Sequence, residues 1–356
     1  MNIRRRRSVS VRKAESHATM IVNDEKEFIT MKGKKYISLL ALILCAMLLL
    51  SACGAEKAAG TQLELVTSLD QAILALASGK CDAVALDGTT AKNYVDQSDG
   101  LFAMSGINFD LTMYGDFEGN VAAVKKGETD LIQAINACIQ TAVEENYYSL
   151  WTAIAKLQSG TDDDAARELV GDMPIYSDAP IDGTYLYLLD TSELKKPELD
   201  LSAAQGVLAQ VLEKGTLVIA TSPDYPANEF ITEDGVIYGC EMMLAKYVAD
   251  CLGVSLQIEA MDFMATLTAL DTGKVDAAFS GYGWKADRAE SYELSIGYVG
   301  DDDITFHTLI VPADKADQYK SLQDFVGKHI IAQASSLQQM YVEDQILALD
   351  PAGKAA

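Results

Sequence analysis

The chain has 356 residues, 49% of them hydrophobic, which is enough apolar material for one or two buried cores. Beyond residue 53 it carries 18 Lys and Arg against 48 Asp and Glu, a formal charge of −30. A chain this acidic repels the phosphates of nucleic acids, so composition excludes a nucleic-acid-binding protein, and we interpret the charge as a contribution to solubility.

The N-terminal segment has the pattern of a secretory signal. Three lysines precede an uncharged run from Ile37 to Leu50, which is shorter than the roughly 20 residues that a membrane-spanning helix needs. A basic segment, a short apolar segment and small residues before a cleavage site define a signal peptide. We therefore predict a signal peptide at 31–53, preceded by a disordered or non-native basic extension at 1–30. An ordinary membrane anchor is the alternative.

The end of this segment, Leu50-Ser51-Ala52-Cys53, resembles a bacterial lipobox. The resemblance implies that Cys53 becomes the lipid-modified first residue of the mature protein. The chain is then expected at the extracytoplasmic face of the cell membrane, held there by its lipid, with a tether at 54–60.

Beyond the tether, short apolar runs alternate with amphipathic stretches, which predicts alternating strands and helices. Strands are expected at Gln62–Val66, Ala83–Leu86, Val121–Val124, Leu217–Thr221, Ser255–Glu259, Ala277–Phe279, Phe306–Val311 and Lys328–Gln333. Helices are expected at Thr129–Tyr147, Ser202–Lys214, Gly239–Leu252, Ser321–Val326 and Gln338–Leu347.

Two segments share one pattern at a constant offset of 194 residues. Ala75–Ala83 reads ALASGKCDA and Ala269–Ala277 reads ALDTGKVDA. In both, an amphipathic stretch ends near a glycine and an apolar run follows, as expected for a helix with a C-terminal glycine before a buried strand. Two such units predict two α/β lobes. Residues 157–204, rich in Asp and Pro, interrupt the alternation and predict a connector with a local strand at Tyr185–Leu189.

Four motifs, in this order and spacing, resemble the family 3 extracellular solute-binding proteins, the amino-acid-binding class. They are the opening strand and ligand loop at Leu217–Pro226, the entry to a long helix at Gly235–Gly253, the serine-to-arginine signature at Ser280–Arg288, and the turn at Ile331–Gln338. The resemblance implies an α/β, two-lobe type II periplasmic-binding-protein (Venus-flytrap) fold without cofactor or metal.

The family segments stand in a permuted order. The chain ends inside the expected second lobe, and residues near its start resemble the remainder. The expected layout is the second part of lobe 2 at 61–117, the hinge strand and closing helices of lobe 1 at 118–156, the connector at 157–204, the first part of lobe 1 at 205–305, a hinge strand at 306–313 and the first part of lobe 2 at 314–356. A circular permutant and a fragment of a tandem protein both explain this order.

The resemblance also implies a ligand site. Arg288 matches the arginine that clamps the ligand carboxylate, a bidentate task suited to guanidinium, and Asp87 matches the aspartate that receives the ammonium. The alternatives without ligand binding are that Arg288 is a surface residue at a helix start and that Asp87 is a helix cap.

Five further residues complete the expected site. Aromatic rings are expected to pack on the ligand side chain, and hydroxyls to bond its polar groups, although core packing and helix capping explain some of these residues equally well. The residues are Tyr225, Phe263, Trp284, Ser280 and Ser336.

The sequence thus predicts a monomeric binding protein that captures an amino acid or a similar small solute and delivers it to the permease of an ABC importer. A non-binding remnant of a tandem protein is one alternative. A dehydratase-like enzyme on the same fold is another, but His307 and His329 lack an evident acid–base partner in the sequence, so we predict no enzyme.

Overall fold

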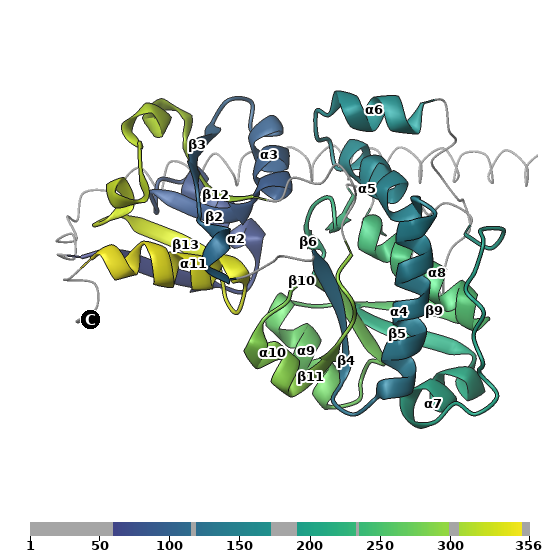
Figure 1. Cartoon of the computed structure of the whole chain (residues 1–356). Coiled ribbons are helices and arrows are strands. Elements are labelled where there is room, and N and C mark those ends of the chain that lie inside the picture. The colour runs from purple at the N-terminus through teal and green to yellow at the C-terminus, as the bar shows by residue number, and fades with distance from the viewer. Residues whose placement is uncertain (1–59, 115–118, 172–190, 233–234, 299–305, 351–356) are drawn as a thin grey trace, which may run out of the picture. The chain divides into compact units, whose positions relative to one another are not determined.

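The computed structural model describes residues 60–114, 119–171, 191–232, 235–298 and 306–350, which form two α/β lobes (Figure 1). Each lobe is built on its own five-stranded sheet. We call the lobe whose sheet contains β5 (Thr216–Thr221) lobe 1, and the lobe whose sheet contains β2 (Ala83–Asp87) lobe 2. The predicted two-lobe α/β fold class is confirmed.

In the sheet of lobe 2, four strands run in one direction, and one antiparallel strand lies next to the edge strand. Its order is β1 (Gln62–Val66), β13 (His329–Gln333), β2, β12 (His307–Pro312) and β3 (Phe102–Asn108). β1, β13 and β2 are parallel, whereas β12 runs antiparallel to both of its neighbours.

The sheet of lobe 1 repeats this plan. Its order is β11 (Tyr292–Leu294), β4 (Asn120–Lys125), β10 (Ala277–Gly283), β5 and β9 (Ser255–Ala260). β9, β5 and β10 are parallel, and β4 is antiparallel to β10 and β11. A small sheet of β6 (Asp224–Tyr225), β7 (Glu229–Ile231) and β8 (Ile237–Tyr238) follows β5.

Both sheets combine strands that are far apart in the sequence, as the purple and yellow strands of lobe 2 show in Figure 1. In each sheet the chain enters the antiparallel strand directly from the other lobe. β4 of lobe 1 is the next strand after β3 of lobe 2, and β12 of lobe 2 is the next strand after β11 of lobe 1. The two crossing segments are paired, because Asn120 and Tyr298 exchange backbone hydrogen bonds of 2.9 and 3.0 Å. The chain therefore passes between the lobes along two neighbouring segments.

The central strands are buried on both faces, which explains their unbroken apolar sequences. In β2, Ala83 and Ala85 belong to the core under α11 (Leu337–Gln345), whereas Val84 and Leu86 belong to the core under α2 (Leu69–Ala77). Successive side chains of a strand point to opposite faces, so a strand covered on both sides has no polar face.

Helices cover both faces of each sheet. Lobe 1 contains α4 (Thr129–Glu144), α5 (Tyr147–Gln158), α7 (Gly206–Lys214), α8 (Cys240–Leu252), α9 (Phe263–Asp271) and α10 (Ala286–Ser291), and lobe 2 contains α2, α3 (Gly88–Asp96) and α11. Short 3-10 turns in lobe 2 lie at Leu111–Tyr114, Ala313–Gln318, Leu322–Phe325 and Leu347–Leu349. Within the described ranges, every helix falls short of the length and apolar character that a bilayer crossing requires.

Several predicted elements need correction. The helix expected at Thr129–Tyr147 ends at Glu144, because Asn146 is left-handed at φ 59° and starts a second helix, α5. The strand β10 extends four residues beyond Phe279 and so carries Ser280 and Gly281. The connector is not free of helix, since α6 (Asp164–Val170) begins there with Asp163 as its cap. The strand expected at Tyr185–Leu189 lies outside the described residues.

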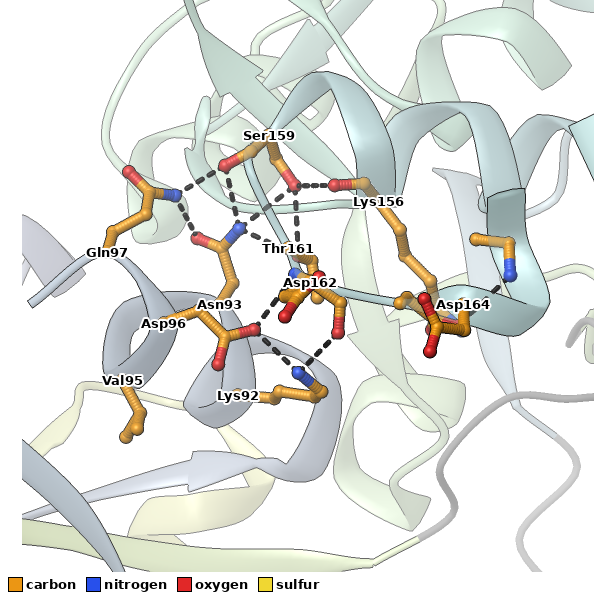
Figure 2. Close-up of polar contacts among 12 residues, drawn as sticks. Lys92, Asn93, Val95, Asp96, Gln97, Lys156, Ser159, Thr161, Asp162 and Asp164 are labelled. Atoms are coloured by element: carbon orange, nitrogen blue, oxygen red, sulfur yellow. Dashed lines mark hydrogen bonds and ion pairs between the residues drawn. The ribbon is translucent and has the colours of Figure 1, made fainter. Parts of the chain in front are cut away.

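A buried polar network joins the two lobes beside α3 (Figure 2). The Asn93 amide nitrogen, fully buried, donates to the Ser159 carbonyl and hydroxyl oxygens at 2.8 and 3.0 Å and to the Thr161 hydroxyl at 2.8 Å. Gln97 donates to the same Ser159 carbonyl, and Lys92 donates to the Asp162 carbonyl at 2.6 Å. We call this set the interlobe clasp, since α3 belongs to lobe 2 and residues 159–162 follow α5 of lobe 1.

Candidate functional site: a cleft between the lobes

A cleft lies between the lobes and brings together six of the seven predicted ligand residues. Its walls include Tyr225, Phe263, Ser280 and Arg288 from lobe 1, and Asp87 and Ser336 from lobe 2. Trp284 is the exception. It follows the last residue of β10, its side chain is 54% exposed, and it lines a separate surface depression with Lys285 and Met340. The position just after the strand end turns the indole away from the cleft.

Arg288 ties the two lobes together. It is only 6% exposed and lies on α10, with its guanidinium 5.0 Å from the ring centre of Tyr282. One terminal nitrogen donates to the Gly283 carbonyl in lobe 1, and the other donates to the Ser335 carbonyl in lobe 2 at 3.0 Å. Burial lowers the pKa of Arg288, but a guanidinium stays charged in proteins. Three of its five N–H groups remain for other acceptors.

Asp87 combines the two roles considered for it. It ends β2, and its Oδ1 accepts a hydrogen bond of 3.0 Å from the Thr90 backbone, which caps α3. Its Oδ2 is buried and has no hydrogen-bond partner of normal geometry among the described residues. One oxygen is therefore structural, and the other lacks a partner of normal geometry in a residue that lines the cleft, although the Tyr225 hydroxyl lies near enough to interact with the Asp87 carboxyl group.

Tyr225 and Gly281 are in close contact across the cleft wall. A Cβ atom at Gly281 would lie 2.5 Å from the Tyr225 ring, and the residue has φ +58°. Only glycine fits under the ring in this conformation. Phe263 is buried and packs against Tyr282 with ring centres 5.2 Å apart, so it serves the core of lobe 1 as well as the cleft.

The two serines are already engaged in local structure. The Ser280 hydroxyl accepts from the Ser222 backbone at 2.9 Å, which fixes the loop after β5. The Ser336 hydroxyl accepts from the Gln339 backbone at 3.1 Å and donates to the Gln333 carbonyl at 2.7 Å. Helix capping therefore accounts for Ser336, which begins α11.

Three carboxylates in or beside the cleft were not among the predicted site residues. The first, Asp224, joins the lobes: its Oδ2 accepts from the Leu69 backbone of lobe 2 at 2.7 Å, and its Oδ1 from Ser222 at 2.8 Å. Burial raises its pKa. Its position in the loop motif at Leu217–Pro226 was the available signal.

The other two are Glu229 on β7 and Glu241 on α8, both fully buried. Glu241 accepts from the Gly281 backbone at 3.0 Å and from the Asn120 amide at 2.9 Å, and burial raises its pKa to about 7. Neither oxygen of Glu229 has a partner of normal geometry in the described part of the chain. Burial, then the nearby charge of Glu241, raises the pKa of Glu229 well above its usual range, although the Ser280 hydroxyl lies near enough to lower it slightly.

His307 is neutral in this setting. It pairs with Asp87 across β12 and β2, its Nδ1 lies 3.0 Å from the Gln338 amide nitrogen, and burial lowers its pKa to about 4. Among the described residues that line the cleft, Arg288 is therefore the one cationic side chain, and it stands against the carboxyl groups of Asp87, Asp224 and Glu229.

The described residues thus form a two-lobe α/β fold with two crossing segments and a polar cleft between the lobes. Residues 217–327 match the model of the bacterial extracellular solute-binding proteins, family 3. This match runs from β5 to the residues just before β13, so it covers most of lobe 1 and the start of lobe 2.

Curated relatives agree with this match. The chain is 30% identical over 131 residues to the probable ABC transporter extracellular-binding protein YckB of Bacillus subtilis, covering 36% of this chain and 44% of that protein. It is 31% identical over 126 residues to the arginine-binding extracellular protein ArtP of B. subtilis, covering 35% and 47%. It is 27% identical over 128 residues to the L-cystine-binding protein TcyJ of Escherichia coli, covering 36% and 47%. The chain thus spans less than half the length of these relatives.

Proposed function

We propose that this chain is an extracytoplasmic solute-binding protein that captures an amino acid for an ABC importer. The observation that carries this proposal is that one cleft contains a buried cation, Arg288 on lobe 1, and a buried carboxyl oxygen without a partner of normal geometry, on Asp87 of lobe 2. A zwitterion supplies the complementary charges, and buried charges are stable only when they are paired. The printed functions of ArtP and TcyJ, which bind arginine and cystine, support an amino acid as the solute.

In this proposal Arg288 binds the carboxylate with its unused N–H groups, and Asp87 Oδ2 accepts from the ammonium. Because these residues belong to different lobes, a ligand held by both binds the closed arrangement better than an open one. Its differential affinity then shifts the population of the two arrangements, which is the signal a permease can recognise.

We also propose that the chain is a circular permutant of the family module, with residues 61–156 completing the lobes begun by 205–356. The mixed origin of both sheets supports this order of segments, since β1, β2 and β3 pair with β12 and β13, and β4 pairs with β10 and β11. Residues 157–204 then join the original ends, and the segment layout predicted above is retained.

The proposed location rests on the signal peptide at 31–53 and the lipid site at Cys53, both of which lie outside the described residues. A Cys53→Ser variant expressed in bacteria is expected to leave the membrane fraction and lose labelled fatty acid. Retention of both properties in that variant would contradict the lipid anchor.

The test of binding is thermal unfolding of the purified chain with each L-amino acid at millimolar concentration. A ligand that binds only the folded state must raise the unfolding midpoint. We expect one or a few amino acids to do so, and the shift to disappear in Arg288→Ala and Asp87→Asn. Asp317→Asn, an exposed charge-matched change, should keep it. A cooperative unfolding transition that no amino acid shifts would refute the proposal.

A further inference from the structure

The cleft has a second polar region beyond Arg288 and Asp87. Around Glu229 it is lined by Tyr148 and Thr152 of α5, by Asn120 and Tyr298 of the crossing segments, and by Asn228 and Cys240. We call this region the distal subsite. Its walls come from segments separated by more than 100 residues in the sequence, so no single local motif predicts this subsite.

Buried polar atoms without partners gather in this subsite. Among the described residues, both carboxylate oxygens of Glu229 and the Thr152 hydroxyl lack a hydrogen-bond partner of normal geometry. Glu229 is 0% exposed. Native structures rarely leave buried polar groups unsatisfied, and a group of them in one cavity indicates a ligand that completes their bonds.

A cation would complete the bonding of Glu229, because it favours the ionised carboxylate that burial and the nearby Glu241 disfavour in the free chain. The neighbouring Glu241 is also a carboxyl group, and it already accepts from the Gly281 backbone and the Asn120 amide. In the part of the chain that the structure describes, the one cationic side chain lining the cleft is Arg288, which donates to carbonyls near the other end. Under the proposed function, the ligand zwitterion uses Arg288 and Asp87, and Glu229 still lacks a counter-charge. No group of three or more metal-ligating side chains occurs in the described ranges, so a metal ion is a poor candidate.

The distance along β10 fits a long side chain. Arg288 bonds the Gly283 carbonyl, whereas Glu229 lies beside Gly281, where its Oε1 is 3.5 Å from the position of a Cβ atom. Two residues of a strand span about 6.6 Å, close to the reach of an extended lysine or arginine side chain. Tyr225 pairs with Glu229 across β6 and β7, so its aromatic ring is placed to contact a cation bound there.

We propose that the distal subsite receives a guanidinium or primary ammonium group, so that the solute is an amino acid with a cationic side chain. This inference rests on the proposed function and extends it to a class of substrate. Glu229 supplies the counter-charge, and Thr152 supplies a hydrogen-bond partner. Tyr225 covers the cation with its ring.

The test compares isosteric ligands with and without the charge, by calorimetric titration of the full chain. Arginine against citrulline and lysine against norleucine are matched pairs. We expect each cationic ligand to bind at least 100-fold more tightly than its neutral partner. Glu229→Gln should reduce this preference below tenfold, whereas the exposed, charge-matched Glu213→Gln should leave it unchanged. Circular dichroism of each variant verifies that it is folded.

The outcomes separate the two proposals. If an amino acid binds but citrulline or glutamine equals arginine, the cationic subsite is overturned and the amino-acid-binding function stands. If folded wild-type chain binds no amino acid, both are overturned. If agmatine, which lacks the carboxylate, binds as tightly as arginine, the distal subsite is supported and the role of Arg288 is refuted.

Discussion

Arg288 of lobe 1 donates a hydrogen bond of 3.0 Å to the backbone carbonyl of Ser335 in lobe 2, while its other terminal nitrogen bonds Gly283 in its own lobe. The residue proposed to hold the ligand carboxylate is thus also a bond between the lobes. A planar guanidinium can serve both purposes, because its donors point in fixed and different directions.

Arg288→Lys should therefore weaken ligand binding although it keeps the charge. A lysine ammonium cannot reach both carbonyls and also present a bidentate pair to a carboxylate. We expect at least a tenfold loss of affinity for the best amino acid, measured by calorimetry. A lysine variant that binds as tightly as wild type would remove the bidentate clamp from the mechanism.

Asn93→Ala should loosen the interlobe clasp. The change removes three hydrogen bonds from one fully buried amide and leaves Ser159 and Thr161 with fewer partners, which we expect to cost about 2–3 kcal/mol of unfolding free energy. Urea unfolding measures the loss, and small-angle scattering tests whether the lobes separate. Lys274→Ala is the control, because its ion pair with Glu259 is partly exposed, lies within lobe 1 and should contribute less than about 1 kcal/mol. Equal losses in the two variants would contradict the clasp.

The stability of the free chain should carry a specific pH signature from Glu241. Its pKa rises from 4.5 when exposed to about 7 in the fold, so between these values the folded state holds a proton that the unfolded state has released. Stability from this group is therefore greatest below pH 4.5 and decreases as the pH rises toward 7, by about 3 kcal/mol in total.

His307 changes the stability in the opposite direction with pH, so the experiment must separate its contribution from that of Glu241. Its pKa falls from 6.5 to about 4 by burial, so stability is lost as the pH falls through that interval. The unfolding free energy of wild type minus that of Glu241→Gln, recorded from pH 5 to 8, removes the contribution of His307 and leaves that of Glu241, including its effect on the pKa of Glu229. This difference should decrease with rising pH, and a flat difference would mean that Glu241 ionises normally in the fold.

Much of the fold was accessible from the sequence because the central strands are buried on both faces. A run such as Ala83–Leu86 has no polar face, and a glycine precedes it at the end of a helix. Both signals are local. The connector helix α6 was missed because consecutive aspartates suggested a loop, whereas Asp163 caps the helix and Arg167 pairs with Asp162 and Asp164.

The site was accessible only in part. Asp87 and Arg288 occupy motif positions, and the cleft brings them together. Glu229 carried no such signal, and Glu241 lies in the motif at Gly235–Gly253 but was not singled out, since a glutamate in a short loop or helix is ordinarily exposed. Glu241 interacts with Asn120 and Tyr298, and these two residues come from crossing segments that are paired with each other but lie far apart in the sequence.

Gly239 and Gly253, at the two ends of α8, should respond very differently to alanine. Gly239 has φ +139°, and a Cβ atom there would lie 1.9 Å from the Asn228 carbonyl oxygen, so Gly239→Ala requires the backbone to move. We expect a loss of about 3 kcal/mol or more. Gly253→Ala meets open space at φ +71° and should cost only about 1 kcal/mol. Similar unfolding free energies for the two variants would contradict the close approach at Gly239.

Cys251 should be the most reactive thiol among Cys81, Cys138, Cys240 and Cys251. Of these four free cysteines, Cys251 is partly exposed, whereas the other three are buried. Hydrogen bonds from Cys138 and Tyr247 lower its pKa, whereas burial raises the pKa of Cys81 to about 12. Because the thiolate is the nucleophile, iodoacetamide at neutral pH should label Cys251 first, as read by peptide mass spectrometry of the folded chain. If Cys138 is labelled before Cys251, Cys138 is the thiolate of the pair, and Cys251 donates the hydrogen bond instead of accepting it.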